Sequence, residues 1–220
     1  EGGTVTGRFS SSNPNLQQIP ARDPEIKKMI RGLFIPEDGE KWGSFDYASQ
    51  EPRWLAHYCA TLTGARRDPQ IDDVVRMYHE GNADFHQMVA DMAGVSRKEA
   101  KTVNLGIMYG MGKKKLAGTL DITKEDAEGL LHKYHQKVPF VKGMADLAMN
   151  QASDKGVIRT WLGRKCRFNL WEPRSYGYNR ALPLEDAVKE YGGKGMIRRA
   201  FCYKALNRLI QGSSADQTKK

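Results

Sequence analysis

The stretch from residue 96 to residue 112, SRKEAKTVNLGIMYGMG, predicts a single helix with two different faces. Ser96 and Glu99 have the spacing of a capping box at the start of a helix, and Gly110 and Gly112 predict its end. At 100° per residue, one narrow sector of this helix is apolar and is expected to pack on a core. Its residues are Ala100, Val103, Ile107 and Met111.

The opposite stripe of the same helix steps by four residues through two cations, an apolar residue and an aromatic residue. Its members are Arg97, Lys101, Leu105 and Tyr109. Two cations one turn apart suit a chain of phosphates, and an apolar side chain followed by an aromatic one offers a surface on which a base can stack. The spacing therefore predicts a helix that holds a nucleoside triphosphate. A merely solvated basic face is the alternative that this spacing leaves open on its own.

The composition limits the class of protein to which the chain can belong. With 220 residues and 40% apolar content, the chain can bury one large core or two modest ones. No run approaches the roughly 18 apolar residues of a membrane-spanning helix, and no signal-peptide pattern is present, so we expect no membrane partner. Cys59, Cys166 and Cys202 are far apart, which predicts a reducing, cytoplasmic setting. The formal net charge of +9 favours a polyanionic partner.

Two segments in the first quarter of the chain have distinctive polar patterns. Residues 6–20 read TGRFSSSNPNLQQIP, which by composition is a loop. Residues 46–53 read DYASQEPR and come at the end of an expected strand at residues 41–47. A helix is expected to start there, with Pro52 suited to its first position.

Three later segments also stand out. Residues 82–94 predict a capped helix that carries His86, which in isolation reads as an ordinary polar surface residue. Residues 156–168 alternate around Gly163 and predict a hairpin. Residues 195–216, GMIRRAFCYKALNRLIQGSSAD, predict a long helix. Further helices are expected over residues 26–31, 54–63, 113–120, 123–138 and 143–155.

In this order the segments resemble the sequence motifs of DNA polymerases of family A, the polymerase I type. The helix at residues 96–112 is similar to the R-x-x-x-K nucleotide-binding helix of the polymerase fingers, and residues 46–53 are similar to the first catalytic motif of the palm, D-Y-S-x-x-E-x-R. Pro52 and Ala48 depart from the common residues of that motif and indicate a phage or organellar branch. Four separated motifs span nearly the whole chain.

The resemblance implies an α+β fold that is mainly helical, with fingers helices, part of a palm sheet and an incomplete right-hand architecture. Residues 1–20 would bind the primer-template, residues 21–63 would be the first part of the palm, and residues 64–155 would be the fingers. Residues 156–194 would hold the hairpin and a variable loop, with an extended loop or a small insertion from residue 169 onward. Residues 195–220 would be a palm helix.

The implied reaction is the template-directed transfer of deoxynucleotides from dNTPs to the 3′-OH of a DNA primer in replication, with two Mg²⁺ ions as cofactors. Asp46 and the backbone carbonyl of Tyr47 would ligate these ions, and Glu51 would exclude a ribose 2′-OH. The triphosphate, sugar and base would be held by His86, Arg97, Lys101, Leu105 and Tyr109, with Lys101 also catalytic because it faces the leaving phosphate.

The resemblance also assigns residues to the primer-template DNA. They are Arg8, Asn15, Gln17, Arg164, Lys165, Asn207 and Gln211. The arginine that family members carry before Asn207 falls on Tyr203 here, with Lys204 beside it, so that contact differs.

The chain has no H-D-E hairpin, which in the family carries the second catalytic carboxylate. We therefore expect the chain to be part of a longer polymerase whose missing parts are its partners, and we expect the isolated chain to be inactive. Two alternatives remain from the sequence: a single-subunit RNA polymerase, against which Glu51 argues, and a non-catalytic DNA-binding module.

Overall fold

Helices make up most of the regular structure in the computed structural model, which describes residues 3–20, 23–81, 84–175 and 180–220. The helices that follow one another along the first two thirds of the chain are α1 (Pro24–Arg31), α2 (Gln50–Ala60), α3 (Ile71–His79), α4 (Phe85–Ala93), α5 (Arg97–Met108), α6 (Lys113–Leu120), α7 (Lys124–Lys137) and α8 (Pro139–Lys155). The elements after them are β1 (Val157–Arg159), β2 (Lys165–Arg167), β3 (Leu170–Pro173), β4 (Leu182–Pro183), α9 (Leu184–Tyr191), β5 (Ile197–Arg199) and α10 (Ala205–Lys219).

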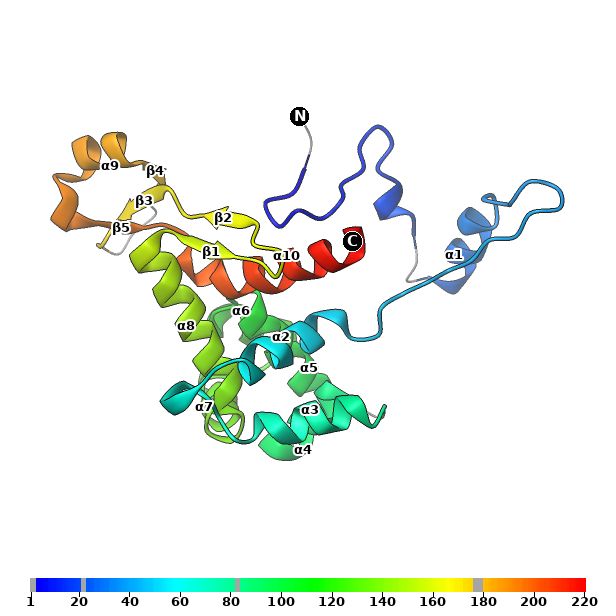
Figure 1. The fold of residues 1–220 in the computed structure, drawn as a ribbon, viewed down its shortest axis with the longest axis horizontal. Coiled ribbons are helices and arrows are strands. Elements are labelled where there is room, and N and C mark those ends of the chain that lie inside the picture. Colours follow the sequence, from blue (N-terminus) through cyan, green and yellow to red (C-terminus); the bar gives the residue numbers. More distant parts are fainter. Residues whose placement is uncertain (1–2, 21–22, 82–83, 176–179) are drawn as a thin grey trace.

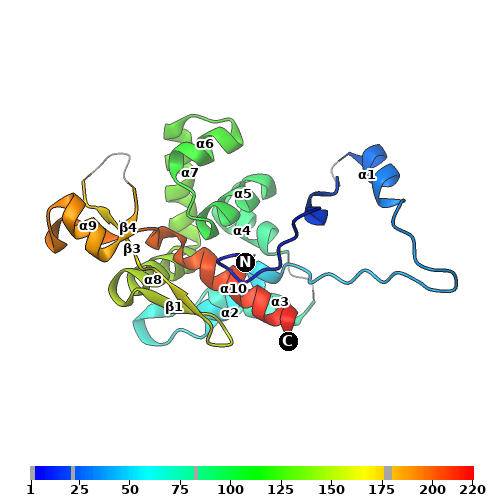
Figure 2. The same ribbon diagram turned by 90° about the horizontal axis from the view of Figure 1, so that it is seen from above.

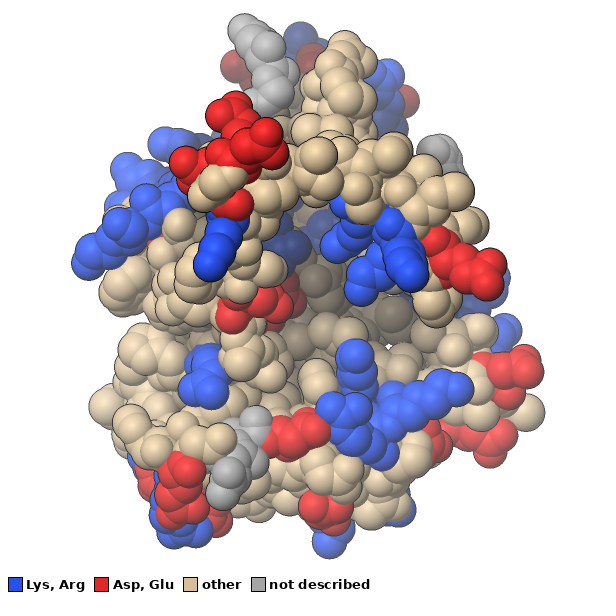
Figure 3. Space-filling view, turned by 90° about the vertical axis from the view of Figure 1, so that its right-hand side faces the viewer, with Lys and Arg blue, Asp and Glu red and all other residues tan. Residues whose placement is uncertain are grey.

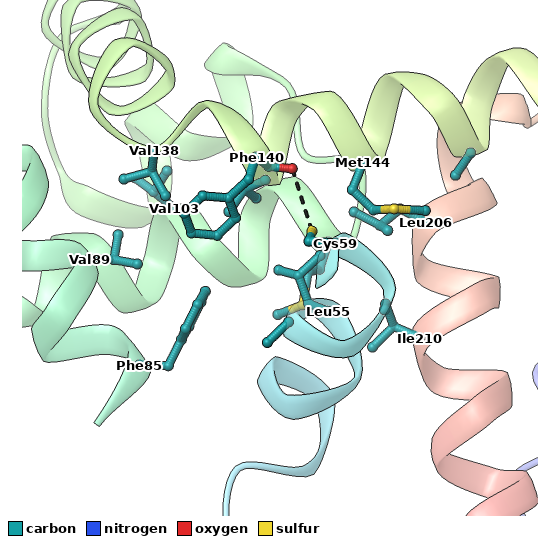
Figure 4. Close-up of a cluster of buried hydrophobic side chains, with 14 of the residues drawn as sticks. Leu55, Cys59, Phe85, Val89, Val103, Val138, Phe140, Met144, Leu206 and Ile210 are labelled. Carbon is teal, nitrogen blue, oxygen red and sulfur yellow. Dashed lines mark hydrogen bonds between the residues drawn. The ribbon is translucent and has the colours of Figure 1, made fainter. Parts of the chain in front are cut away.

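The core lies where α2, α4, α5, α8 and α10 meet. Leu55 on α2, Val103 on α5 and Ile210 on α10 are fully buried in it. Figure 4 shows Phe140 and Met144 of α8 above Cys59, whose thiol donates a hydrogen bond of 3.6 Å to the carbonyl oxygen of Phe140. Burying each such side chain contributes roughly 1.5–3 kcal/mol, so this cluster fixes the positions of the helices that carry polar residues on their other faces.

Helix α5 forms as its sequence predicts. The Ser96 hydroxyl accepts from the Glu99 amide and the Glu99 carboxylate accepts from the Ser96 amide, which completes the capping box. The helix ends at Met108, and Gly110 follows at a φ of +66°, a conformation that glycine adopts without strain. Of the apolar stripe, Ala100 and Val103 are fully buried, while Ile107 and Met111 are half-buried.

The neighbouring helices also begin at the residues that cap them. The Asp84 carboxylate accepts from the amides of His86 and Gln87 and starts α4, and Thr123 does the same for α7. The expected helix start at Asn82 lies outside the described residues. The expected helices at residues 113–120 and 143–155 are confirmed by α6 and by the longer α8.

Two small antiparallel sheets complete the fold. Strands β1 and β2 pair with Ile158 opposite Cys166, so the expected hairpin is confirmed, with Gly163 in its turn at a φ of +81°. Strand β3 lies between β4 and β5 in the second sheet, and α9 packs against it. Figure 1 shows this second sheet and α9 at the end of the molecule remote from α1.

Three expectations about local structure were wrong. Residues 41–47 form an extended segment and not a strand, because no neighbouring segment among the described residues supplies a backbone ladder to it. Of the two alternatives for residues 169–195, the extended loop is wrong, since the described part folds into β3, β4 and α9, while the small insertion stays a prediction. The last helix begins at Ala205 and not at Gly195, because Phe201 adopts a φ of +62° that breaks the helix and β5 pairs with β3 before it.

Residues 3–20 and 23–49 lie outside the helical body. Figures 1 and 2 both show the N-terminal segment passing beside α10, while α1 and the segment after it extend away from the other helices. Helix α1 buries none of its residues, and Phe45 is 97% exposed. Across the described residues, no helix has the length and apolar character that spanning a membrane requires.

Candidate nucleotide-binding site

The polar stripe of α5 faces away from the core. Arg97 and Lys101 are exposed, Leu105 is half-buried, and Tyr109 is 43% exposed at the end of the helix. Nε of Arg97 donates a hydrogen bond of 2.8 Å to Oδ2 of Asp84 at the start of α4, and Nη2 of Arg97 forms an ion pair with the same oxygen at 2.8 Å. The hydrogen bond from Arg97 holds the pKa of Asp84 below its usual value, so the pair stays charged. The stripe therefore carries one partly neutralised cation, Arg97, and one turn later Lys101, which forms no ion pair with the described residues.

His86 comes to this stripe from α4. Its Nδ1 atom lies 3.2 Å from Nδ2 of Asn104, and its ring is half-buried. Burial lowers the pKa of His86, and the charges of Lys101 and Arg97 lower it further, while Asp84 opposes both effects. His86 is therefore a neutral imidazole at neutral pH. The structure brings together the imidazole and the two cations that the sequence assigned to a triphosphate, which are His86, Arg97 and Lys101.

Glu51 joins the other end of the stripe to two distant segments. Its side chain is 15% exposed, accepts a bond of 3.2 Å from the Tyr109 hydroxyl and forms an ion pair with Arg8. Gln211 on α10 donates a bond of 2.8 Å to the same Tyr109 hydroxyl. Burial raises the pKa of Tyr109 and the Glu51 charge raises it further, so the hydroxyl remains protonated and can donate to Glu51. Asn207, one turn before Gln211, is half-buried on α10.

Arg164 does not extend from the tip of the hairpin as expected for a DNA contact. Its guanidinium points toward α10, where it bonds to the Asp216 carboxylate at 3.1 Å and to the carbonyl oxygens of Thr6 at 2.7 Å and Gly212 at 3.0 Å. If the Arg164 guanidinium left these acceptors for a DNA phosphate at the surface, it would lose more hydrogen-bonding free energy than the phosphate contact would supply. Lys165, the next residue, is exposed on β2.

The remaining residues of the N-terminal segment have local roles in this structure. The Asn15 side chain accepts from the Gln17 amide and caps the short turn Leu16–Gln18. The Gln17 side chain donates to the carbonyl oxygen of Phe9 at 3.0 Å. Both side chains are exposed, and the segment that carries them lies beside α10 (Figure 1).

Asp46 and Tyr47 lie at a different place from the α5 stripe. Both line a cleft of about 600 Å³ with Trp161 of the hairpin turn and with one face of α2. Glu51 reaches Tyr109 from another face of α2. Among the described residues, no hydrogen bond or ion pair joins Asp46 to the stripe. Among the described residues, the expected metal ligand therefore lines a cleft that none of the expected triphosphate ligands lines.

The donor set at Asp46 consists of one carboxylate and the carbonyl oxygen of Tyr47. The described part of the chain contains no cluster of three or more His, Cys, Asp or Glu residues that could enclose a metal ion. Hard oxygen donors suit Mg²⁺, which is usually held by one or two carboxylates together with waters and substrate phosphates rather than by a closed protein cage. The residues present therefore fit part of such a site.

Several residues of the site were missed by the sequence reasoning. Asn104 and Tyr134 connect to His86 from the buried side of α5, and Asp216 holds Arg164. The signal that could have found them is a polar residue on an apolar face: Asn104 falls between Ala100 and Met108 on the core side of its helix and is fully buried. Figure 3 shows that Lys and Arg side chains gather on both sides of a hollow in one face of the molecule.

The whole chain, residues 1–220, matches the family profile of DNA polymerase family A. A DNA-directed DNA polymerase of Pseudomonas phage M6 is 36% identical over 255 residues, which cover 99% of this chain and 35% of the phage protein. A thermostable DNA polymerase I of Thermus aquaticus is 34% identical over 226 residues, which cover 98% of this chain and 23% of that protein.

A solved structure gives the same answer at the level of the fold. The polymerase domain of Pol1 from M. smegmatis, in complex with DNA primer-template and dNTP, matches with a TM-score of 0.69 and 30% identity over 98% of this chain and 34% of that one. The chain spans about a third of the length of the phage relatives that it matches. The profile, the relatives and the shared fold agree, and the chain belongs to DNA polymerase family A.

Proposed function

We propose that this chain forms the nucleotide-binding part of a DNA-directed DNA polymerase that transfers deoxynucleotides from dNTPs to the 3′-OH of a primer. The observation that carries the proposal is the α5 stripe with His86 beside its first turns and Glu51 bonded to Tyr109 at its end. Membership of family A and the dNTP and primer-template named for the M. smegmatis structure support it. Further segments of the same polymerase would complete the site, since the relatives are about three times longer.

In this proposal each residue of the stripe has one task. Lys101 is free of ion pairs among the described residues and contributes a positive charge at the leaving phosphates, and Arg97 leaves Asp84 to bind the same phosphates. Leu105 packs against the sugar of the incoming nucleotide. Glu51, whose side chain Tyr109 holds, occupies the space that a 2′-OH needs and selects deoxynucleotides.

Asp46 and the Tyr47 carbonyl would hold divalent metal, with Mg²⁺ as the ion that their hard oxygen atoms and the substrate phosphates fit best. When bound, the metal would activate the primer 3′-OH and stabilise the charge of the leaving group. Since Asp46 lines a cleft that the α5 stripe does not line, we propose that DNA and nucleotide binding bring them together, as closure of a fingers helix does in an induced-fit check.

The primer-template would lie along the N-terminal segment and α10. We propose that Arg8, Asn15 and Gln17 contact it together with Lys165, Asn207 and Gln211, and that Arg164 supports this surface from within. We assign residues 1–20 to primer-template binding, residues 21–63 and 195–220 to the palm, residues 64–155 to the fingers and residues 156–194 to the hairpin and its insertion. The three free cysteines support a reducing, cytoplasmic setting.

The test is primer extension by the purified polymerase that contains this chain. We expect extension with dNTPs but not with NTPs, and we expect it to stop when EDTA removes divalent metal. Asp46→Ala and Lys101→Ala should each lower kcat by at least about 100-fold, the scale of a lost charge at a transition state. Lys124→Ala, which removes an exposed cation from the first turn of α7, is the matched control and should leave the rate unchanged.

The two alternatives predict different results. Efficient use of NTPs would mean an RNA polymerase, and DNA binding without extension under any metal condition would mean a binding module. Full activity in Asp46→Ala would remove the metal assignment from that residue.

A further inference from the structure

The buried face of α5 carries a polar side chain at the one point where an apolar residue is expected. Asn104 is 0% exposed and lies between two partners from other helices, His86 of α4 and Tyr134 of α7. A buried amide needs hydrogen bonds to offset the loss of water, because each donor or acceptor left unpaired in the core destabilises the fold. An apolar residue at position 104 would carry no such desolvation cost, so packing alone does not explain the amide.

The orientation of the Asn104 amide follows from its partner Tyr134. The Tyr134 side chain is fully buried, and burial raises the pKa of its hydroxyl far above the ordinary range, so the hydroxyl keeps its proton. Among the described residues the acceptor for that proton is Oδ1 of Asn104. With Oδ1 occupied in this way, Nδ2 of the same amide is the atom that faces His86.

The facing atom determines which ring nitrogen of His86 carries the proton. Nδ2 of Asn104 is only a donor, and it lies 3.2 Å from Nδ1 of His86, so Nδ1 must be the unprotonated acceptor. A neutral imidazole with a bare Nδ1 carries its proton on Nε2. The opposite amide orientation would accept from an Nδ1–H but would leave the Tyr134 hydroxyl proton without an acceptor in a fully buried place.

We propose that Asn104 is a positioning residue that holds His86 as the neutral Nε2–H tautomer, so that the imidazole presents a hydrogen-bond donor rather than a positive charge to a polyphosphate. The polyphosphate part of this statement rests on the proposed function, whereas the tautomer does not. In this arrangement Arg97 and Lys101 neutralise the phosphate charge, and His86 contributes a hydrogen bond and not a third positive charge.

The groups that face His86 agree with this assignment. Burial disfavours the charged ring and Lys101 and Arg97 on α5 disfavour it further, while among the described residues Asp84 at the start of α4 favours it. Protonating Nδ1 would place two donors against each other and break the bond to Asn104. An imidazolium therefore requires either a turned amide, with Tyr134 left unpaired, or the movement of His86 away from α5.

The experiment measures the tautomer directly by NMR of the chain with ¹⁵N-labelled histidine rings, in the absence of nucleotide. The chain has five histidines, and His86→Gln assigns the signals of His86. At neutral pH we expect a bare Nδ1 and a protonated Nε2. A protonated Nδ1, with or without Nε2–H, would overturn the proposal.

Substitutions at Asn104 separate positioning from packing. Asn104→Asp changes the donor into an acceptor at almost the same volume, so we expect Nδ1 to become protonated and the pKa of His86 to rise by about 1–3 units. Gln87→Glu makes the same amide-to-acid change one residue from His86, but its side chain bonds to Asp91 at 2.8 Å, and it should leave the tautomer unchanged. An unchanged His86 in Asn104→Asp, or an equal change in Gln87→Glu, would overturn the proposal.

A second variant decides the matter if Asn104→Asp does not fold. Tyr134→Phe removes the hydroxyl that orients the amide, while both Asn104 and His86 remain. We expect the single tautomer of His86 to be replaced by a mixture of the two. Retention of the pure Nε2–H form would count against the proposal that Tyr134 orients the Asn104 amide. Each of these measurements is made without nucleotide, so they test the tautomer of His86 even if primer extension fails. The proposed function is tested by primer extension alone.

Discussion

At the scale of the residue, Leu105 is the member of the α5 stripe with the least expected chemistry. It is half-buried and packs against the core cluster with one side, while Lys101 and Tyr109 flank it on the exposed face. The family usually carries Phe or Tyr at this position, so under the proposed function this chain would lack both a flat ring and a hydroxyl at the nucleotide sugar. Its effect should therefore fall on substrate choice more than on stability.

We predict that Leu105→Tyr sharply raises the use of dideoxynucleotides, because a tyrosine hydroxyl can replace the missing 3′-OH. Leu105→Phe should leave that selectivity unchanged and improve dNTP binding by about 1 kcal/mol, since Leu already fills much of the volume. Steady-state kcat/KM for dNTPs and dideoxynucleotides in the intact polymerase measures both effects. Equal selectivity in all three proteins would show that Leu105 does not face the sugar.

At the scale of the element, the second half of α10 is the piece to which the hairpin and the N-terminal segment attach. Arg164 joins Asp216 to the carbonyl oxygen of Thr6, the Trp161 amide donates to the Ser213 hydroxyl at 3.1 Å, and the Leu162 amide donates to Asp216. Hairpin and segment are thus held by hydrogen bonds to one helix.

Asp216 should make the stability of this junction depend on pH. Burial alone would raise the pKa of Asp216, but bonds from Thr160, Arg164 and the Leu162 amide hold it below its usual value. A lowered folded pKa means that the contribution is complete above pH of about 4 and is lost as pH falls through the folded value. We predict that Asp216→Asn lowers the free energy of unfolding by about 2–3 kcal/mol at pH 7, and by less below pH of about 4, in urea titrations.

Asp146→Asn is the matched control for that measurement. Asp146 pairs with Lys142 one turn away on the exposed surface of α8, so its loss should cost no more than about 0.5 kcal/mol. An equal loss in both variants would mean that the Arg164–Asp216 pair contributes no more than a surface pair.

Close packing at the same junction gives a second prediction for an element. A Cβ atom added at Gly212 would lie 2.5 Å from Cγ2 of Thr160 and 2.9 Å from the Arg164 guanidinium, whereas nothing lies within 4 Å of one at Gly129 on α7. We predict that Gly212→Ala destabilises the chain by about 1–3 kcal/mol through overpacking, and that Gly129→Ala stabilises it by about 0.5–1 kcal/mol through helix propensity. Thermal unfolding of the two variants should shift in opposite directions; a shift of both to higher temperature would mean that the hairpin yields freely at Gly212.

At the scale of the whole molecule, the net charge of +9 is spread over a surface that is hollowed on one face (Figure 3). Arg8, Lys101 and Lys165 are exposed, while Arg164 is turned inward. A surface of this kind binds a polyanion by releasing its counterions and reads little of its sequence.

We predict that the affinity for duplex DNA varies little with sequence and falls steeply with salt. Between 50 and 200 mM salt the affinity should fall by roughly 10-fold for every two DNA phosphates that the protein neutralises. Lys165→Ala should reduce the salt slope by about 1, whereas Arg164→Ala should act through stability instead. Fluorescence anisotropy with two unrelated duplexes at several salt concentrations measures this. A flat salt response, or a strong preference for one duplex, would contradict it.

The features that could be predicted from the amino-acid sequence are those whose causes are local. The capping box of Ser96 and Glu99, the cap of α4 at Asp84, the turn at Gly163 and the two stripes of α5 depend only on neighbouring residues, and the motif order identified the family. These predictions hold because capping and helical period act within one or two turns.

Contacts between residues far apart in the sequence could not be predicted and became visible in the folded chain. Asn104 reads as a polar interruption until α4 and α7 bring His86 and Tyr134 to it, and Arg164 reads as a DNA ligand until α10 offers Asp216. Residues 41–47 have the composition of a strand but find no partner among the described residues. In each case the outcome depends on a contact across many residues, because buried polar groups and backbone ladders are satisfied by partners that no local pattern specifies.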